Sequence, residues 1–192
     1  MKTIEKIDKL TNEKFLNLYK IRYNVDGKPY SYQVASRKDI SSLAVNKNSS
    51  ADAVRILPYF KKDGKIYIVV IKEFRYAVNK YLYGTPAGLI DEGEDGKASA
   101  IRELKEEIGA NVIKIEKIQN KAYSSAGLSD ESLEFYEAEI KLDDKQSLEE
   151  FEDIKVEIVE FKDLLNFVDS HNFCLQSALH LKLFYYKNLK EM

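Results

Sequence analysis

The sequence predicts an α+β fold, in which a mixed β-sheet is combined with one central helix and helices in the last third of the chain. Several short stretches alternate apolar and polar side chains, as half-buried strands do. Residues 95–108 instead repeat their apolar side chains with helical spacing. The expected order, three strands, a helix, three strands and a helical end, does not repeat as strand–helix–strand units, which argues against a doubly wound sheet.

The first fifty residues are predicted to form a β-hairpin after a charged leading segment. Alternating side chains define its two strands: Tyr19, Ile21, Tyr23 and Val25, then Tyr30, Tyr32 and Val34. Asp26-Gly27 between them is a turn signal. The polar stretch 47–52 reads as a connector, so we expect residues 1–50 to form an N-terminal β extension and residues 51–192 the main domain.

The main domain is predicted to begin with apolar strands at 53–60 and 66–74, joined through Asp63-Gly64. The helix at 95–108 should end at Gly109, since glycine readily adopts the left-handed conformation that closes a helix. Residues 122–130 and 143–153 are expected to be loops. The remaining elements are strands at 81–83, 112–118, 133–142 and 154–158, and helices at 162–168 and 175–187.

Composition excludes several classes of protein. The 192 residues carry 30 Lys+Arg against 32 Asp+Glu, so no global charge attracts nucleic acid or a membrane. The single cysteine, Cys174, permits no intramolecular disulfide and no Cys-based zinc site, and His171 and His180 lack ligand spacing. No segment resembles a signal peptide or approaches the roughly 20 apolar residues that span a bilayer. We therefore expect a cytoplasmic protein without nucleic-acid or membrane partners.

Acidic residues gather in residues 88–110, GLIDEGEDGKASAIRELKEEIGA. Helical spacing predicts an apolar face and an opposite acidic face, formed by Ile101, Leu104 and Ile108 and by Glu103, Glu106 and Glu107 respectively. Three carboxylates on one turn repel each other unless water or a cation relieves the crowding. Carboxylates are hard oxygen ligands suited to Mg²⁺ or Mn²⁺. The letters ELKEE alone are more typical of a solvated helix surface, so the wider spacing decides the interpretation.

That wider spacing resembles the Nudix box of the Nudix hydrolase superfamily. The matching positions are Gly88, Glu94, Arg102-Glu103-Leu104, Glu106-Glu107 and Gly109, and the departure is Ala110, where the family usually has a bulky aliphatic. The resemblance implies an α/β/α sandwich with a loop–helix–loop metal site. It also implies that Glu103, Glu106 and Glu107 bind Mg²⁺ or Mn²⁺ with the carbonyl of Ala87, and that Glu94 and Arg102 form a bracing ion pair.

Three further segments resemble the ADP-ribose pyrophosphatase branch: Glu73-Phe74-Arg75-Tyr76, Thr85-Pro86-Ala87-Gly88 and residues 125–131, SAGLSDE. The resemblance implies hydrolysis of ADP-ribose or a related nucleoside diphosphate sugar by a homodimer that exchanges its N-terminal extension. Three positions depart from the branch, which usually has Gln at Glu73, Glu at Gly84 and Pro at Ala126. The sugar and the base therefore stay open.

Candidate substrate-binding residues follow from the same resemblance. Arg75 ends a predicted strand, where a guanidinium can bind phosphate through two hydrogen bonds. Gly127 lies in the loop after the box, and Tyr30 or Tyr32 could stack on adenine, although most such tyrosines pack within sheets. In the branch the catalytic base lies in a late acidic loop, here residues 148–153, and we favour Glu152 and then Glu150.

Two alternatives remain open. One is a regulatory Nudix module that senses a nucleotide sugar without catalysis, but such modules generally lose the box carboxylates that this chain keeps. The other is a Nudix nucleoside triphosphatase or a cap-removing enzyme. The N-terminal extension and the loop after the box argue against both of these enzymes, and the balanced charge argues mildly against a long RNA substrate.

Overall fold

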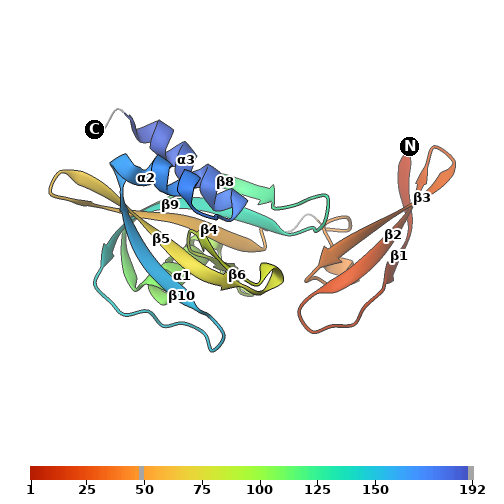
Figure 1. Ribbon diagram of the computed structural model, residues 1–192. Helices are drawn as coiled ribbons and strands as arrows, with labels where there is room; N and C mark the ends of the chain where they lie inside the picture. Colours follow the sequence, from red (N-terminus) through yellow and green to blue (C-terminus); the bar gives the residue numbers. More distant parts are fainter. Residues whose placement is uncertain (48–49, 190–192) are drawn as a thin grey trace. The chain divides into compact units, whose positions relative to one another are not determined.

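The computed structural model describes residues 1–47 and 50–189, which fold into two compact units (Figure 1). The first unit contains Met1–Asp52 and Lys121–Leu133, and the second contains Ala53–Asn120 and the chain from Glu134 onwards. The predicted α+β class, with a central helix and two later helices, is confirmed. The proposal that residues 1–50 act as a separate extension stays a prediction.

The first unit is built on an antiparallel sheet of three strands, β1 (Lys2–Lys9), β2 (Asn17–Val25) and β3 (Lys28–Ser36). The predicted hairpin is β2–β3, and its turn has positive φ at Asp26 and Gly27, as a tight two-residue hairpin turn requires. The leading charged segment, expected outside the hairpin, forms β1. A mostly exposed edge strand needs few apolar residues, so the sequence pattern gave no signal for it.

The loop at 124–131 belongs to the first unit, although the chain before Lys121 and after Leu133 belongs to the second. The backbone N–H of Ala35 donates to the carbonyl of Leu128 at 2.9 Å, and that of Ala44 to the Asp130 carboxylate at 3.0 Å. Lys38 forms ion pairs with Asp52 and Asp130 at 2.8 and 3.8 Å. A small apolar core lies beneath the sheet: Tyr19, Ile21, Val34 and Leu43, the last following the 3-10 turn Ile40–Ser42.

The second unit contains a seven-stranded sheet. Its path runs β10 (Ile154–Glu160), β5 (Lys65–Arg75), β4 (Ala53–Lys62), β9 (Ser132–Leu142) and β8 (Ala110–Tyr123). Two short strands join this path, β6 (Lys80–Gly84) on β5 and β7 (Ala87–Leu89) on β4. The predicted connection of β4 and β5 through Asp63-Gly64 is confirmed, and both residues of this turn have positive φ.

Helices cover both faces of this sheet (Figure 1). Helix α1 (Gly96–Ile108) packs on one face, where Leu104 and Ile108 meet Val54 and Ile56 of β4. Helices α2 (Leu164–Ser170) and α3 (Leu175–Asn188) pack on the other, after the 3-10 turn Phe161–Asp163. The second unit is thus an α/β/α sandwich. No helix in the described ranges is long and apolar enough to cross a membrane.

Candidate active site

Helix α1 follows the glycine-rich loop after β7. Asp95 caps the helix by accepting the backbone N–H of Ala98 at 2.8 Å, and Gly109 closes it with a φ of 62°. The predicted faces were partly wrong: Ile101 is exposed, whereas Glu103 and Glu107 are buried. These carboxylates lie against Gly88 and Ala87 of β7 and are withdrawn from water.

Arg102 joins the loop to the helix. Its guanidinium contacts Glu94 at 3.2 Å, which is the ion pair expected from the sequence, and its Nη2 donates to the carbonyl of Leu89 at 3.0 Å. The hydrogen bonds from Arg102 hold the pKa of Glu94 below its ordinary value. Nη1 also donates to Glu103 at 2.7 Å and to Glu106 at 3.0 Å. With Asp91 at 3.8 Å, Arg102 therefore partly neutralises four carboxylates.

The Glu103 carboxylate lies directly against the backbone of Gly88. A Cβ at position 88 would overlap this carboxylate, so a side chain there and the present Glu103 rotamer exclude each other. The glycine that the motif fixes is therefore required by close approach, not by an unusual backbone angle. Burial raises the pKa of Glu103, and the opposing charge of Arg102 partly offsets that rise.

Glu107 is the most deeply buried of the three helix carboxylates, at 3% exposure. Its pKa lies well above the ordinary value, first because of burial and then because of the charges of Glu103, Glu73 and Glu152. The backbone N–H of Ala87 donates to this carboxylate and opposes the rise. Its Oε2 has no hydrogen-bond partner among the described residues. Because buried polar atoms are normally paired, this oxygen is available to a ligand.

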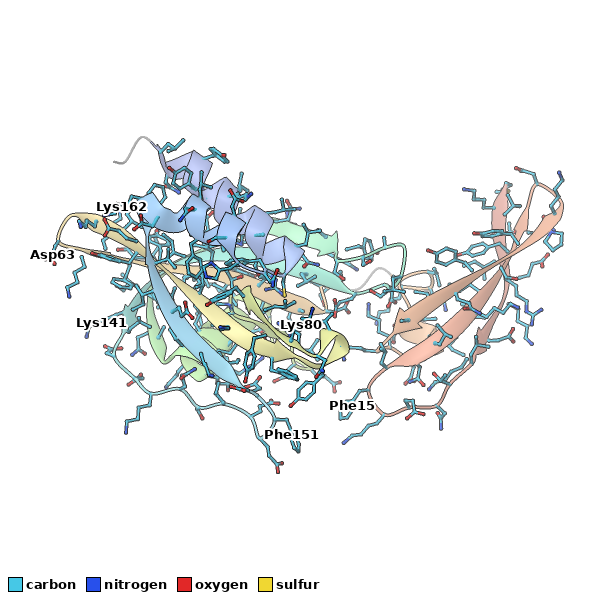
Figure 2. All side chains as sticks on the ribbon, viewed as in Figure 1. Phe15, Asp63, Lys80, Lys141, Phe151 and Lys162 are labelled. Carbon is cyan, nitrogen blue, oxygen red and sulfur yellow. The ribbon has the colours of Figure 1, made fainter. Side chains whose placement is uncertain are left out.

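An acidic loop lies close to these carboxylates. The charge of Glu152 contributes, after burial, to the raised pKa values of Glu73, Glu103 and Glu107. Two tyrosines of the β5–β6 region hold the loop: the Tyr81 hydroxyl donates to Asp153, and the Tyr76 hydroxyl to the carbonyl of Phe151 at 3.4 Å. The labelled Phe151 marks this loop in Figure 2.

The residues fit a hard divalent cation. Glu103, Glu106 and Glu107, here called the acid cluster, offer the carboxylate oxygens that such a cation prefers. One of these oxygens, Oε2 of Glu107, is buried without a hydrogen-bond partner among the described residues. Among the described residues, no group of three or more acidic, His or Cys side chains is already placed to hold an ion. The Nη1 of Arg102 donates to Glu103 and to Glu106, so a cation held by these two carboxylates would take the place of these hydrogen bonds.

Comparison with known proteins identifies the family. The sequence model of the NUDIX domain matches residues 50–175. This chain belongs to the Nudix family. It is 32% identical over 161 residues to "Putative nudix hydrolase 2" of Caenorhabditis elegans, covering 79% of this chain and 72% of the relative. It is also 36% identical over 110 residues to the "ADP-ribose pyrophosphatase" of Bacillus subtilis (strain 168), covering 56% and 58%.

A solved structure confirms the Nudix fold. The crystal structure of an ADP compounds hydrolase superposes with a TM-score of 0.71 at 18% identity, covering 100% of this chain and 97% of the other. At this identity the likeness shows the fold alone. With the family model and the complete set of box carboxylates, the chain is a Nudix hydrolase.

The predicted substrate residues of the Nudix hydrolase fall in different units. Arg75 ends β5 and pairs at 2.6 Å with Glu73, whose charge contributes to the raised pKa of Glu107. Tyr30, Tyr32 and Gly127 belong to the first unit, where the Tyr32 hydroxyl donates to the carbonyl of Gly127 at 2.6 Å.

The two candidate bases also differ in their surroundings. Glu150 is exposed at the surface of the acidic loop. Glu152 is partly buried, accepts the backbone N–H of Glu149 at 2.9 Å, and acts electrostatically on the cluster. Its partial burial and its charge effect on Glu103 and Glu107 favour Glu152 over Glu150, and both assignments stay predictions.

Sequence reasoning missed Arg55, a buried arginine of β4. It donates from Nη1 to the carbonyl of Thr85 at 3.0 Å and to the hydroxyl of Ser177 at 2.8 Å. Its sequence context, AVRILPYF, reads as an ordinary strand in which an arginine would face water. The one available signal is its place within a nearly continuous apolar run, typical of a strand buried on both faces.

Proposed function

We propose that this Nudix hydrolase cleaves the pyrophosphate bond of ADP-ribose or a related nucleoside diphosphate sugar, giving a nucleoside monophosphate and a sugar phosphate. The observation that carries the proposal is the buried Glu107 carboxylate, which has an unpartnered oxygen beside Glu103. Such a cluster suits the binding of a cation and, through it, a polyphosphate. The name of the Bacillus subtilis relative supports the substrate class.

The proposed metal is Mg²⁺ or Mn²⁺. Glu103, Glu106 and Glu107 would hold it, helped by the carbonyl of Ala87. When bound, such an ion neutralises phosphate oxygens and lowers the pKa of a bound water. Arg102, released from Glu103 and Glu106, would keep its contacts to Glu94 and Leu89, so the loop and the helix would stay joined.

The remaining steps are assigned to side chains around the acid cluster. Arg75 binds a phosphate of the substrate, since a guanidinium can donate two parallel hydrogen bonds to it. Glu152 accepts the proton of the water that attacks phosphorus, and the bond to the bridging oxygen breaks. Tyr30 or Tyr32, with Gly127, contacts the nucleoside in this proposal.

The proposed enzyme is a homodimer. The first unit presents a pocket of about 700 Å³ on its sheet, lined partly by Tyr23, Tyr30 and Tyr32. Tyr30 is 53% exposed there, and a small sheet is stabilised when its aromatic side chains are covered. A second copy of the chain would cover them.

The test is a substrate panel with purified protein. Release of nucleoside monophosphate should be measured from ADP-ribose, several ADP-sugars, other nucleoside diphosphate sugars and nucleoside triphosphates, each with Mg²⁺, with Mn²⁺ and with EDTA. We expect cation-dependent turnover of one or more nucleoside diphosphate sugars. Preferred turnover of triphosphates, or tight binding without turnover of every compound, would overturn the proposal. The panel also shows which sugar and which base are preferred by a chain that carries Glu73, Gly84 and Ala126.

A further inference from the structure

Arg55 places a charge in the interior of the second unit. Its side chain is 8% exposed, and it lies on the face of β4 opposite Val54 and Ile56, toward α3. Its Nη1 donates to two uncharged acceptors, and its Nε–H has no acceptor among the described residues. A buried charge without close compensation costs stability, so its presence calls for an explanation beyond packing.

Arg55 is part of a closed set of hydrogen bonds with Thr85 and Ser177. Besides accepting from Arg55, the Ser177 hydroxyl accepts the backbone N–H of Thr85 at 3.1 Å and lies 3.3 Å from the Thr85 hydroxyl. Thr85 and Ser177 are both fully buried. Both polar backbone groups of Thr85 are thus held, its N–H by Ser177 of α3 and its carbonyl by Arg55 of β4.

The segment held in this way also supports the acid cluster. Ala87, two residues after Thr85, donates its backbone N–H to Glu107, and Gly88 lies against the carboxylate of Glu103. Arg55 is the β-ladder partner of Ala87 in the β4–β7 pairing. One short stretch of backbone therefore connects the hydrogen bonds near α3 to the carboxylates on the α1 side of the sheet.

We propose that Arg55 is a positioning residue for the cation site: with Ser177 it holds the Thr85–Gly88 backbone where Ala87 and Gly88 support Glu107 and Glu103. Its fixed positive charge also interacts through the sheet with Glu107 and Glu73, which reduces the repulsion among the clustered carboxylates. The inference rests on the proposed function, since it assumes that these carboxylates bind a cation.

The test measures cation binding without substrate. The dissociation constant for Mn²⁺ would be determined by electron paramagnetic resonance for wild type, Arg55→Met, Arg55→Lys and Ser177→Ala. We expect Arg55→Met to raise this constant about tenfold or more, the scale of a lost outer-shell contact. Arg55→Lys should restore part of the affinity because it keeps the charge, and Ser177→Ala should cause a smaller loss because the charge remains. Values of kcat and KM for the same variants show whether catalysis follows cation binding.

Lys187→Met is the matched control. Lys187 is a cation of α3, paired with Glu137 at 3.1 Å, and among the described residues it forms no hydrogen bond or ion pair with the Thr85–Gly88 segment. Melting in EDTA shows which variants are folded. Wild-type Mn²⁺ affinity in folded Arg55→Met would overturn the inference; should that variant not fold, wild-type affinity in both Arg55→Lys and Ser177→Ala would do so. Absence of Mn²⁺ binding by wild type would instead refute the proposed function.

Discussion

Gly88 shows how one missing side chain shapes the candidate site. The Glu103 carboxylate occupies the space that a Cβ at position 88 would need, and the neighbouring Ala87 supports Glu107 through its backbone N–H. Two carboxylates of the Nudix box therefore depend on the same two residues of β7. A change at Gly88 acts on the acid cluster by displacing Glu103, not by changing the charge of the site.

The Gly88→Ala variant should lose both cation affinity and activity. Its methyl group would push the Glu103 carboxylate away, and a displacement of about 1 Å in a catalytic group can reduce turnover about a hundredfold. Calorimetric titration with Mn²⁺ and steady-state kinetics would measure the two losses. The control is Leu89→Ala, which shortens an exposed side chain next to Gly88 on the same strand and leaves the backbone unchanged. Equal behaviour of the two variants would contradict the role assigned to Gly88.

Glu107 should make the metal-free protein less stable as the pH rises. Burial and nearby carboxylates raise its pKa in the folded chain well above the ordinary 4.5, so the folded state binds this proton more tightly than the unfolded state does. The resulting stability is fully present below pH 4.5 and is lost as the pH rises through the folded-state pKa.

The Glu107→Gln variant lacks this titration. In EDTA, the free energy of unfolding of wild type should fall relative to that of the variant from about pH 4.5 upward. Urea unfolding at a series of pH values measures the difference, and saturating Mg²⁺ should stabilise wild type more than the variant. Parallel pH profiles for the two proteins would show that Glu107 does not titrate in this way.

The acidic loop between β9 and β10 brings one further carboxylate, that of Glu152, close enough to act on the site. Tyr81 and Tyr76 hold its end, and the backbone N–H of Phe74 donates to the carbonyl of Asp153 at 3.3 Å. The loop is therefore attached to the same strands that carry Arg75. This attachment explains how one side chain of the loop, Glu152, acts on the cluster while its neighbour Glu150 faces water.

Glu152→Gln is expected to lower kcat about a hundredfold or more, the usual scale for a lost general base. Mn²⁺ binding should survive, because the box carboxylates are unchanged. Glu150→Gln is the matched control two positions away, and its kcat should stay close to that of wild type. If Glu150→Gln shows the large loss and Glu152→Gln does not, the base has been assigned to the wrong residue.

The sequence was most informative where local chemistry sets the structure. The turns at Asp26-Gly27 and Asp63-Gly64 and the helix end at Gly109 follow from backbone angles that few residues adopt, and all three were predicted. Strand β1 was missed because a mostly exposed strand has no apolar pattern. Burial of Arg55 was missed because it depends on Ser177 of α3, a partner that no local pattern indicates.

At the scale of the whole molecule, the proposed homodimer can be tested through the exposed tyrosines. Light scattering at micromolar concentration should give twice the mass of the chain. Tyr30→Lys should shift the protein toward monomer, because aromatic side chains dominate the free energy of many interfaces. Tyr186→Lys is a matched control, since Tyr186 is 61% exposed on α3 of the other unit. A monomeric wild type would refute the homodimer.

The interleaved course of the chain constrains how this protein can diverge. In the sequence, the loop that carries Ala126 and Gly127 connects β8 to β9 of the seven-stranded sheet. Its hydrogen bonds and ion pair, however, are made with Ala35, Ala44 and Lys38. A graft of residues 1–52 from a relative would meet a foreign loop. Substitutions in the loop therefore require compensating substitutions in residues 1–52, and we expect the two stretches to vary together among relatives.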